Sequence, residues 1–515
     1  MRGRDFSAGG PIFEKIFVTL QAKQRDNDMN RILLTMLLLI CSLGASAAKV
    51  KYPGKKAFIY RYYLADKNAS TYSLEKPTRY LSRKSVERRQ RQGLAVDSTD
   101  LPVPRSYVRQ FMVKNAEVLG TSRWQNTVLV RSADSTLLCL LAQLPIVKDY
   151  ACVFVAPDSI DKPEPASQNV HETFNRWDSL RGDPMGMART QIEMLGGDRL
   201  HEVDLRGRGM TIAVLDGGFQ NADRLKCFAK TRIKGIHDFV SPLSEDKLYG
   251  GIDHGTKVLS ALAAQAPEVM VGSAPEADYW LLRCEDYFTE MPIEEDYWIM
   301  AAEFADSVGV DIINSSLGYN EYDNGLGSYC LHDLDGKTAM ISRSASMLAR
   351  KGIVLCNSAG NSGMGVWKKI TVPADAFDIL TVGAINQEGK NAPFASIGPT
   401  QDGRVKPDVV ALGSGTTLIS GRGTLVRDMG TSFSTPIVCG LVACLWQGLR
   451  HKTALEIINM VRQSCSQYET PDNILGYGVP DLWQAYMIGR VSLKESSMDA
   501  TPNSKSEDEQ HTDTL

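Results

Sequence analysis

The sequence lacks the usual signatures of a metalloenzyme. Its 515 residues include ten cysteines but no C-x-x-C pair, and its seven histidines form no H-E-x-x-H motif. Protein zinc sites are normally marked by such spacings of cysteine and histidine. The sequence therefore argues against a metal-dependent enzyme, and we expect no metal among the catalytic site residues.

An excess of charge of one sign is also missing. The chain has 57 Lys and Arg residues against 60 Asp and Glu residues, a net charge of −3, which argues against a general nucleic-acid binder. The N-terminal apolar run, Ile32 to Ile40, is too short to span a bilayer comfortably. We expect no nucleic-acid partner and no stable membrane span.

The N-terminal region has the pattern of a secretory signal peptide. Met29-Asn30-Arg31 is a basic start, the apolar run follows, and Ala45-Ser46-Ala47 resembles a cleavage site. Residues 1–28 are interpreted as an over-extended start and residues 29–48 as the signal peptide. The protein is therefore expected to be exported, periplasmic or secreted.

Cysteines in an exported protein raise the question of disulfides. Three that lie inside apolar runs are expected to be buried thiols: Cys356, Cys439 and Cys444. Four others are candidates for disulfide pairs, and the sequence leaves their partners open: Cys227, Cys284, Cys330 and Cys465.

A serine at the start of a buried helix is the strongest candidate for a nucleophile. Gly430 to Pro436 contains Ser432 and opens an apolar run, Ile437 to Trp446, long enough for a buried helix. Pro436 fits the first turn, where an N–H group can be spared. Unpaired N–H groups at a helix start favour developing negative charge. Taken alone, Ser432 is also an ordinary helix cap, so a catalytic role requires a base and an acid elsewhere.

Both partners lie upstream of the serine. The apolar run Thr211 to Leu215 is typical of a parallel strand buried on both faces, and it ends at Asp216. His254 precedes a second helix start, Lys257 to Ala264. A lone histidine is usually structural, but Asp, His and Ser at such element ends follow the chain order of subtilisin.

The chain resembles the bacterial subtilisin-like serine peptidases (subtilases, peptidase S8). The aspartate, histidine and serine motifs of that family match Ile212–Gly217, Asp253–Ser260 and Gly430–Pro436. Five more blocks follow the family order: Asn314–Gly318, Ala359–Gly363, Leu380–Ala384, Phe394–Gly398 and Lys406–Ala411. The resemblance covers residues 187 to 486, and eight blocks in order are far more specific than any single motif.

The resemblance implies a serine endopeptidase with an acyl-enzyme intermediate. Ser432 would be the nucleophile, His254 the general base and Asp216 the residue that orients the imidazole. The backbone N–H of Ser432 and the side-chain amide of Asn361 would form the oxyanion hole. An extended protein or peptide substrate would pair with the backbone of one short segment, made of Ser315, Ser316, Leu317 and Gly318.

Two positions depart from the family pattern. Gly217 replaces the usual Ser or Thr after the aspartate, and Leu412 replaces the proline usual after the last of the conserved strands. Neither position transfers a proton, so the departures affect tuning and not the chemistry. The family needs no cofactor for catalysis. Structural calcium supports many members, and no carboxylate cluster here identifies a calcium site, so calcium is left open.

Strand and helix patterns alternate after residue 187 and predict an α/β domain, a mostly parallel sheet with helices on both faces, over residues 187–490. The polar residues 491–515 are expected to be a disordered tail. Residues 49–156 follow a β-α-β-β-α-β order and are expected to form a small ferredoxin-like α+β domain. Family propeptides have that fold and position, and act as intramolecular inhibitor and chaperone.

The segment between the two expected domains, residues 157–186, is interpreted as an exposed linker in which processing occurs. The basic run Arg83 to Arg91 is interpreted as a solvated helix face of the propeptide and not as a nucleic-acid site.

The sequence argues against two other functions. A catalytically silent, peptide-binding pseudoprotease would have lost at least one of Asp216, His254, Asn361 and Ser432, and all four are present. An α/β-hydrolase would need its serine within G-x-S-x-G and its histidine last in the chain, and this sequence has neither arrangement.

Overall fold

The structure is a computed structural model that describes residues 50–161, 168–172, 174, 178–240 and 246–498. The expected start segment 1–28 and signal peptide 29–48 lie outside the described residues. The chain divides into two units. The described part of the smaller unit is a two-stranded antiparallel ladder formed by β1 (Val50–Lys51) and β6 (Ser159–Ile160).

The larger unit is built on a seven-stranded sheet with the order β15-β14-β13-β12-β7-β11-β8. All neighbouring strands pair in parallel. The central strands are almost continuously apolar and buried, as expected for a sheet covered on both faces. The strands are β7 (Thr211–Asp216), β8 (Arg232–Asp238), β11 (Asp278–Arg283), β12 (Ile312–Ser315), β13 (Val354–Ser358), β14 (Leu380–Ile385) and β15 (Val409–Leu412).

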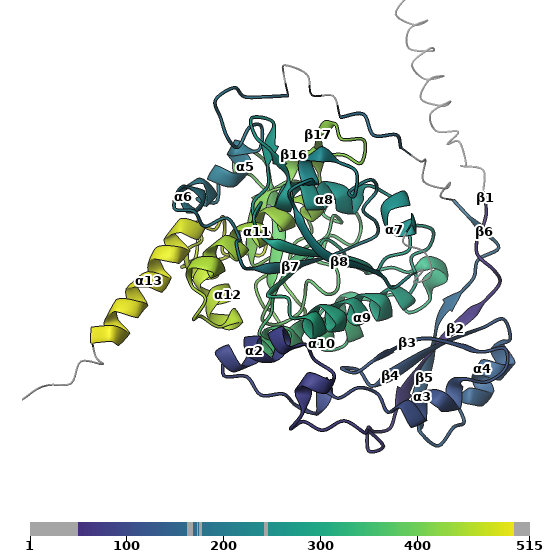
Figure 1. Cartoon of the computed structure of the whole chain (residues 1–515). Helices are drawn as coiled ribbons and strands as arrows, with labels where there is room; N and C mark the ends of the chain where they lie inside the picture. The colour runs from purple at the N-terminus through teal and green to yellow at the C-terminus, as the bar shows by residue number, and fades with distance from the viewer. Residues whose placement is uncertain (1–49, 162–167, 173, 175–177, 241–245, 499–515) are drawn as a thin grey trace, which may run out of the picture. The chain divides into compact units, whose positions relative to one another are not determined.

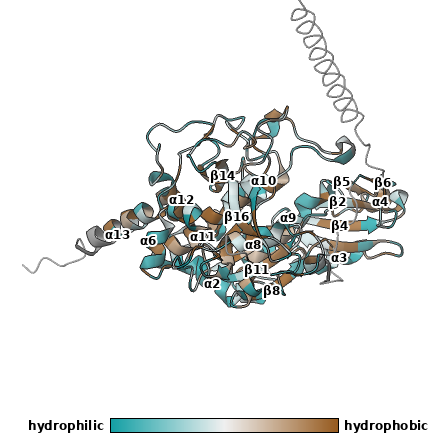
Figure 2. Ribbon diagram, turned by 90° about the horizontal axis from the view of Figure 1, so that it is seen from above, coloured by the Kyte–Doolittle hydropathy of each residue, from teal (hydrophilic) through white to brown (hydrophobic). Residues whose placement is uncertain are grey.

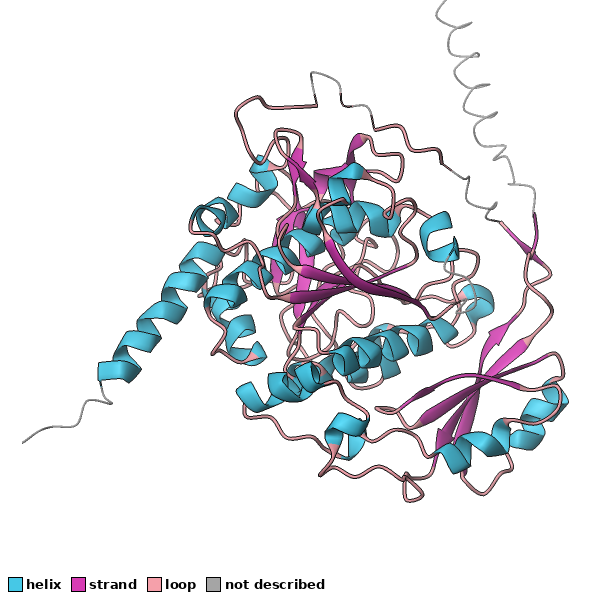
Figure 3. Cartoon of the chain, viewed as in Figure 1, coloured by secondary structure: helices cyan, strands magenta, loops and turns pink. Residues whose placement is uncertain are grey.

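Helices cover both faces of this sheet, which confirms the predicted architecture (Figures 1 and 3). Helices α8 (His254–Ala263) and α11 (Thr431–Gly448) pack on one face, and α9 (Ile293–Val308) and α10 (Met340–Met347) on the other. Hydrophobic residues concentrate in the centre of the molecule along α11 and the strands beside it (Figure 2).

The remaining elements of this domain surround the sheet. They are α5 (Arg189–Glu193), α6 (Gly197–Glu202), α7 (Asp246–Gly250), α12 (Ala454–Gln463) and α13 (Leu482–Met498), with the antiparallel ladders β9 (Gln265–Ala266) with β10 (Met270–Val271) and β16 (Ser414–Ile419) with β17 (Leu425–Met429). In the described part of the chain, no helix combines the length and the apolar character needed to cross a membrane.

Helix α13 corrects one expected boundary. The tail was expected to begin at residue 491, yet the helix continues to Met498. Residues 491–498 contain helix-forming Leu, Lys and Glu, and no Gly or Pro interrupts the chain between Gly489 and Pro502. The polar composition of this segment therefore did not end the helix; residues 499–515 lie outside the described residues.

Residues 58–155 form the expected ferredoxin-like domain. Its antiparallel sheet has the order β3-β4-β2-β5, which is the order of a split β-α-β fold. Two helices pack on this sheet around a core that contains Tyr62, Phe111 and Leu138. The elements are β2 (Phe58–Leu64), α2 (Arg83–Arg91), α3 (Arg105–Phe111), β3 (Glu117–Ser122), β4 (Thr127–Ser132), α4 (Ser135–Leu141) and β5 (Val147–Val155).

The basic helix α2 is solvated on one face only: Arg83, Lys84 and Arg91 are exposed, as its composition predicts. Arg88 and Arg89 are each only 1% exposed. Both guanidinium groups pair with Asp306 of α9, which is fully buried. The prediction was wrong for these two arginines because a carboxylate more than 200 residues away in the sequence supplies the compensating charge.

The cysteines form no disulfide within the described residues. All nine of those described are free thiols, so the candidate pairs among Cys227, Cys284, Cys330 and Cys465 are not made. Three of these four are buried and the fourth, Cys330, is exposed. The expectation of buried thiols at Cys356, Cys439 and Cys444 is confirmed.

Parallel strands bring several candidate site residues to one edge of the sheet. Strand β7 ends at Asp216, β12 ends at Ser315, and β13 ends at Ser358, shortly before Asn361. Helix α8 begins at His254 and α11 begins one residue before Ser432. The carboxyl edge of an open α/β sheet is where ligands of such folds bind.

Candidate active site

Asp216 and His254 form a close pair at the end of β7. Nδ1 of His254 lies 2.9 Å and 3.0 Å from the two carboxylate oxygens of Asp216. Asp216 is fully buried, and its Oδ1 also accepts a hydrogen bond of 2.8 Å from the Gly217 backbone N–H. The His254 side chain remains 31% exposed. The carboxylate therefore fixes the ring through Nδ1 and leaves Nε2 for another partner.

The short distance between these two residues depends on a glycine. Gly255 follows His254 in the first turn of α8, and its N–H donates to the carbonyl of Gly218, 2.9 Å away. A Cβ atom at Gly255 would lie 2.5 Å from that carbonyl oxygen and 3.0 Å from Cβ of Asp216. Any side chain at this position would push the start of α8 away from the end of β7.

The environment of His254 favours its charged form. Burial alone would lower the pKa of His254, but the charge of Asp216 and its hydrogen bond outweigh burial and raise this pKa above its ordinary value. Glu285 adds to the rise, and Lys257 opposes it. Asp216 thus stabilises the imidazolium that forms when the histidine accepts a proton.

Ser432 is held by a reciprocal pair of hydrogen bonds with Ser316. The Ser316 hydroxyl donates to the Ser432 carbonyl, 2.9 Å away, and the Ser432 hydroxyl donates to the Ser316 carbonyl, 3.2 Å away. Among the described residues, no hydrogen bond joins the Ser432 hydroxyl to the His254 ring. The ring does lie against the residue that follows the serine, because its centroid is 5.6 Å from that of Phe433.

Pro436 explains why the Ser432 carbonyl needs an outside donor. The sequence placed this proline in the first turn, but α11 begins at Thr431, so Pro436 is the sixth helical residue. Its missing N–H is the group that would have bonded to the carbonyl of Ser432, four residues earlier. Ser316, the residue that follows β12, supplies the missing hydrogen bond through its hydroxyl. The expectation about the first turn is corrected accordingly.

Asn361 is oriented by the residue that precedes the serine. Its Oδ1 accepts hydrogen bonds from the backbone N–H of Thr431 at 2.9 Å and from the Thr431 hydroxyl at 3.1 Å. The Thr431 hydroxyl also accepts one from the Gly360 backbone N–H at 3.2 Å. With Oδ1 committed to Thr431, the amide nitrogen of Asn361 is the group left to face a ligand. Asn361 itself is exposed.

The four residues predicted to bind substrate differ in their surroundings. Ser315 is fully buried, and its hydroxyl accepts a hydrogen bond of 3.0 Å from Trp298 Nε1. Ser316 faces Ser432, and the Leu317 carbonyl accepts from the side chain of Asn357 at 3.3 Å. Gly318 is half-buried, whereas the other three residues are buried. The side chains of Ser315 and Ser316 thus form hydrogen bonds within the protein. A peptide could therefore pair with this segment only through backbone groups.

Sequence reasoning missed two residues that organise the site. Thr431 was seen only as part of the serine motif, and Ser316 only as part of the substrate segment. Both act through hydrogen bonds to residues far away in the sequence, at separations of 70 and 116 residues. Pro436 within an apolar helix does imply an unpaired carbonyl at Ser432, but nothing in the sequence identifies Ser316 as the donor to it.

The described residues contain no group of three or more His, Cys, Asp or Glu side chains arranged to hold a metal ion.

Gly217, which departs from the family pattern, lies close to the side chain of Glu285. A Cβ atom at this position would lie 2.9 Å from Oε2 of Glu285. This carboxylate occupies the region into which the usual Ser or Thr side chain would project.

Comparison with known families agrees with this geometry. Residues 207–478 match the model of the subtilase family, Peptidase S8, which is more than half of the chain. Residues 59–171 match the Peptidase S8 propeptide domain of Bacteroidota. The match to the subtilase model includes all the candidate site residues, from Asp216 to Ser432.

Three relatives illustrate the range of similar proteins. The chain is 27% identical to subtilisin-like protease SBT6.1 of Arabidopsis thaliana over 319 residues, which covers 60% of this chain and 28% of that protein. It is 27% identical to the membrane-bound transcription factor site-1 protease of Rattus norvegicus, over 62% of this chain and 29% of that protein. Serine protease AprX of Bacillus subtilis is 27% identical, over 53% of this chain and 65% of that protein. The chain spans less than a third of the length of the first two relatives.

The parallel sheet, the Asp, His, Ser order at its carboxyl edge and the match over residues 207–478 lead to one conclusion: the chain belongs to the subtilase family.

Proposed function

We propose that the protein is a serine endopeptidase in which Asp216, His254 and Ser432 form the catalytic triad. The observation that carries this proposal is the pairing of His254 Nδ1 with both oxygens of a fully buried carboxylate. That pairing fixes the tautomer with a free Nε2, which a general base for a serine requires. Ser432 lies in the first turn of α11, where N–H groups favour a developing oxyanion, and the next residue, Phe433, packs against the same ring.

The reaction would proceed by acyl transfer and hydrolysis. A peptide carbonyl placed over Ser432 is attacked by its Oγ while His254 Nε2 accepts the hydroxyl proton. The Ser432 hydroxyl must first rotate away from the Ser316 carbonyl, to which it donates in this structure. His254 then protonates the leaving amine, and a water molecule repeats the sequence to release the acid.

Asn361 would stabilise the tetrahedral intermediates together with the backbone N–H of Ser432. The hydrogen bonds from Thr431 lock the amide oxygen and thereby fix the direction of the amide nitrogen. A donor that is oriented before the reaction costs no reorganisation when charge develops on the substrate oxygen.

One observation favours the alternative function, a silent peptide-binding pseudoprotease. The Ser432 hydroxyl is bonded to Ser316 and not to His254. Hydrogen bonds of catalytic residues are often formed only when substrate is present, so this geometry weighs little against the triad. Substitution of Ser432 separates the two functions.

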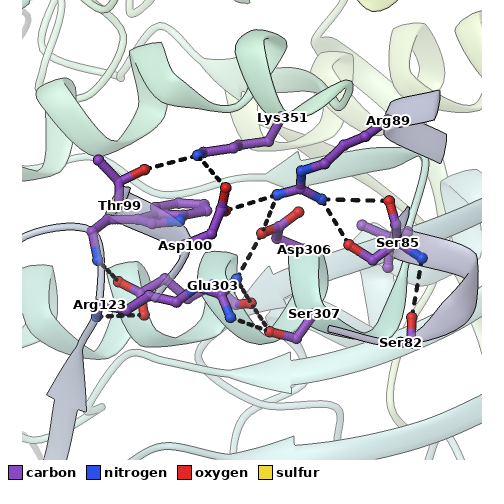
Figure 4. A network of polar contacts seen from close by, with 12 residues as sticks. Ser82, Ser85, Arg89, Thr99, Asp100, Arg123, Glu303, Asp306, Ser307 and Lys351 are labelled. Atoms are coloured by element: carbon purple, nitrogen blue, oxygen red, sulfur yellow. Dashed lines mark hydrogen bonds and ion pairs between the residues drawn. The ribbon is translucent and has the colours of Figure 1, made fainter. Parts of the chain in front are cut away.

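We further propose that residues 49–156 are a propeptide that acts as intramolecular chaperone and inhibitor, and that the protein is exported. The propeptide role is supported by the match of residues 59–171 to a Peptidase S8 propeptide domain and by an interface of buried charges with α9. Export is supported by the signal-peptide pattern of residues 29–48. Asp306 accepts from three arginines of the small domain: from Arg88 at 2.5 Å, and from Arg89 at 2.9 Å and Arg123 at 2.6 Å. Figure 4 shows Asp306 with Arg89 and Arg123. Burial would raise the pKa of Asp306, but the three guanidinium groups outweigh burial and hold it far below its ordinary value.

A second carboxylate of α9 binds the backbone of the small domain. Oε2 and Oε1 of Glu303 accept from the backbone N–H groups of Arg123 and Trp124, and Oε1 also accepts from the Ser122 hydroxyl at 2.5 Å. In the other direction, Lys351 of the catalytic domain donates to Asp100 at 3.0 Å (Figure 4). The two domains therefore satisfy each other's buried charges, as a folding template would.

Ser432→Ala tests the triad and the processing together. The purified wild-type chain is expected to lose about its first 150 to 190 residues on standing and to cleave casein, while the variant stays intact and inactive, since loss of the nucleophile costs on the order of 10⁶ in turnover. Denaturing gels and mass determination of the fragments give the readout. Processing of both chains, with casein cleaved equally by both, would exclude Ser432 as the nucleophile.

Asn361→Ala is expected to lower kcat by about 10² to 10³ and to leave KM nearly unchanged, because the lost donor acts on the transition state. Ser362→Ala, at the next residue, is the control and should retain wild-type kcat. Initial rates on a peptide nitroanilide provide the measurement. Equal rates for the two variants would remove Asn361 from the oxyanion hole.

The pH dependence of kcat/KM should show the raised pKa of His254. The histidine is active only when neutral, so the acidic limb of the profile is expected above the ordinary histidine value. Glu285→Gln removes a negative charge that stabilises the imidazolium, and it should therefore move this limb to lower pH. A limb that stays in place would show that Glu285 does not influence His254.

Arg88→Gln combined with Arg89→Gln should impair folding without touching the catalytic domain. Asp306 would lose two of its three buried partners, at a cost of about 3 to 5 kcal/mol. Recovery of casein-cleaving activity after dilution from urea is expected to fall at least tenfold. Arg131→Gln is the matched control, because its pair with Glu117 is about half exposed and contributes below about 1 kcal/mol. Equal recovery of both variants would contradict the chaperone role.

A further inference from the structure

The surroundings of Ser432 limit where the side chain of the acyl residue can lie. This residue, on the amino side of the cleaved bond, places its carbonyl carbon on Ser432 Oγ and its carbonyl oxygen toward Asn361. Two backbone segments flank that position. Ser316 is bonded to Ser432, and Gly360 donates to Thr431, so Ser316–Gly318 and Gly360–Asn361 lie on either side.

Each of these segments has a glycine that is only half-buried. Gly318 and Gly360 have no side chain to project into the space between them, and both are more exposed than the residues that precede them. An acyl side chain that leaves the scissile carbonyl between the two segments would pass these glycines. The atoms beneath the glycines therefore decide how large that side chain can be.

The side chain of Thr371 lies beneath both glycines. A Cβ atom at Gly318 would lie 3.2 Å from Thr371 Cβ and would collide with Thr371 Oγ1. A Cβ at Gly360 would lie 2.9 Å from Thr371 Oγ1 and 3.1 Å from Thr371 Cγ2. One side chain thus contacts the two backbone segments and fills the space between them.

Thr371 cannot move aside at low cost. Its backbone N–H donates to the carbonyl of Ala359 at 3.2 Å. The next residue, Val372, exchanges two backbone hydrogen bonds with Tyr319, at 2.8 and 2.9 Å. These bonds tie the Thr371 backbone to the segments on either side of it, and its side chain is only 4% exposed.

The Thr371 hydroxyl is a second, independent indication of a ligand. Its Oγ1 is buried and has no hydrogen-bond partner among the described residues. Buried polar atoms are normally paired, so an unpaired one beneath these two glycines calls for an explanation. A small acyl side chain would leave room for a water molecule on Oγ1 or bring a hydroxyl of its own. A large apolar one would seal Oγ1 without a partner.

We propose that Thr371 is a specificity-determining residue that restricts the acyl residue to small side chains: glycine, alanine or serine. The inference rests on the proposed function, because it assumes attack by Ser432. Thr371 excludes larger residues by volume, since Oγ1 and Cγ2 occupy the space that a phenylalanine or leucine side chain would need. The expected substrates are extended peptides with a small residue immediately before the cleaved bond.

Peptide nitroanilides that differ only at the acyl residue test this proposal. The processed enzyme, with active sites counted by a fluorophosphonate, should hydrolyse the alanine substrate with kcat/KM about 10- to 200-fold above that of the phenylalanine substrate. Thr371→Ala removes Oγ1 and Cγ2 and should reduce this ratio at least tenfold. Thr371→Val keeps the volume and removes only the penalty for the unpaired hydroxyl, so its ratio should stay well above that of Thr371→Ala.

The outcomes separate the inference from the proposed function. A wild-type enzyme that reacts with the fluorophosphonate but hydrolyses both substrates equally would overturn the size limit alone. An unchanged ratio in Thr371→Ala, or a ratio in Thr371→Val that falls as in Thr371→Ala, would also overturn it. A wild-type chain that does not react with the fluorophosphonate at all would overturn both proposals.

Discussion

The position of the candidate nucleophile depends on a hydrogen bond that its own helix cannot make. Pro436 leaves the Ser432 carbonyl without an intrahelical donor, and the Ser316 hydroxyl takes that place. The same two residues are joined a second time through the Ser432 hydroxyl. These two hydrogen bonds hold the start of α11 against the end of β12, where the chemistry would occur. The proline is the reason that the Ser432 carbonyl is free to accept one of them.

The other parts of the site follow from close approaches that leave no room for side chains. Gly255 lets α8 begin against Asp216, and Gly318 and Gly360 let two backbone segments meet above Thr371. Hydrogen bonds then orient what the glycines bring together, with Thr431 holding Asn361 and Asp216 holding His254. Distances near 3 Å between these groups result from missing Cβ atoms as much as from the catalytic residues themselves.

The sequence predicted the sheet, its covering helices and the four candidate catalytic residues, because these leave local signals. An apolar run ending at Asp216 and a small-residue helix beginning near Ser432 can be recognised without knowing their partners. The contacts of Ser316, Thr371 and Arg88 could not be predicted, because each depends on a partner brought near only by folding. Composition even misled for Arg88 and Arg89, since a run of arginines is normally solvated.

Helix α9 has two different faces. One packs beneath the parallel sheet, and the other presents Asp296, Glu303 and Asp306 to the small domain, where Arg61, Arg123, Arg88 and Arg89 meet them. The charges of the small domain and of α9 are therefore complementary in sign and in position. A propeptide from another subtilase, without arginines at these places, would bury carboxylates that it cannot neutralise. The positions of the arginines therefore restrict which small domain can pack against α9 without leaving a buried charge unpaired.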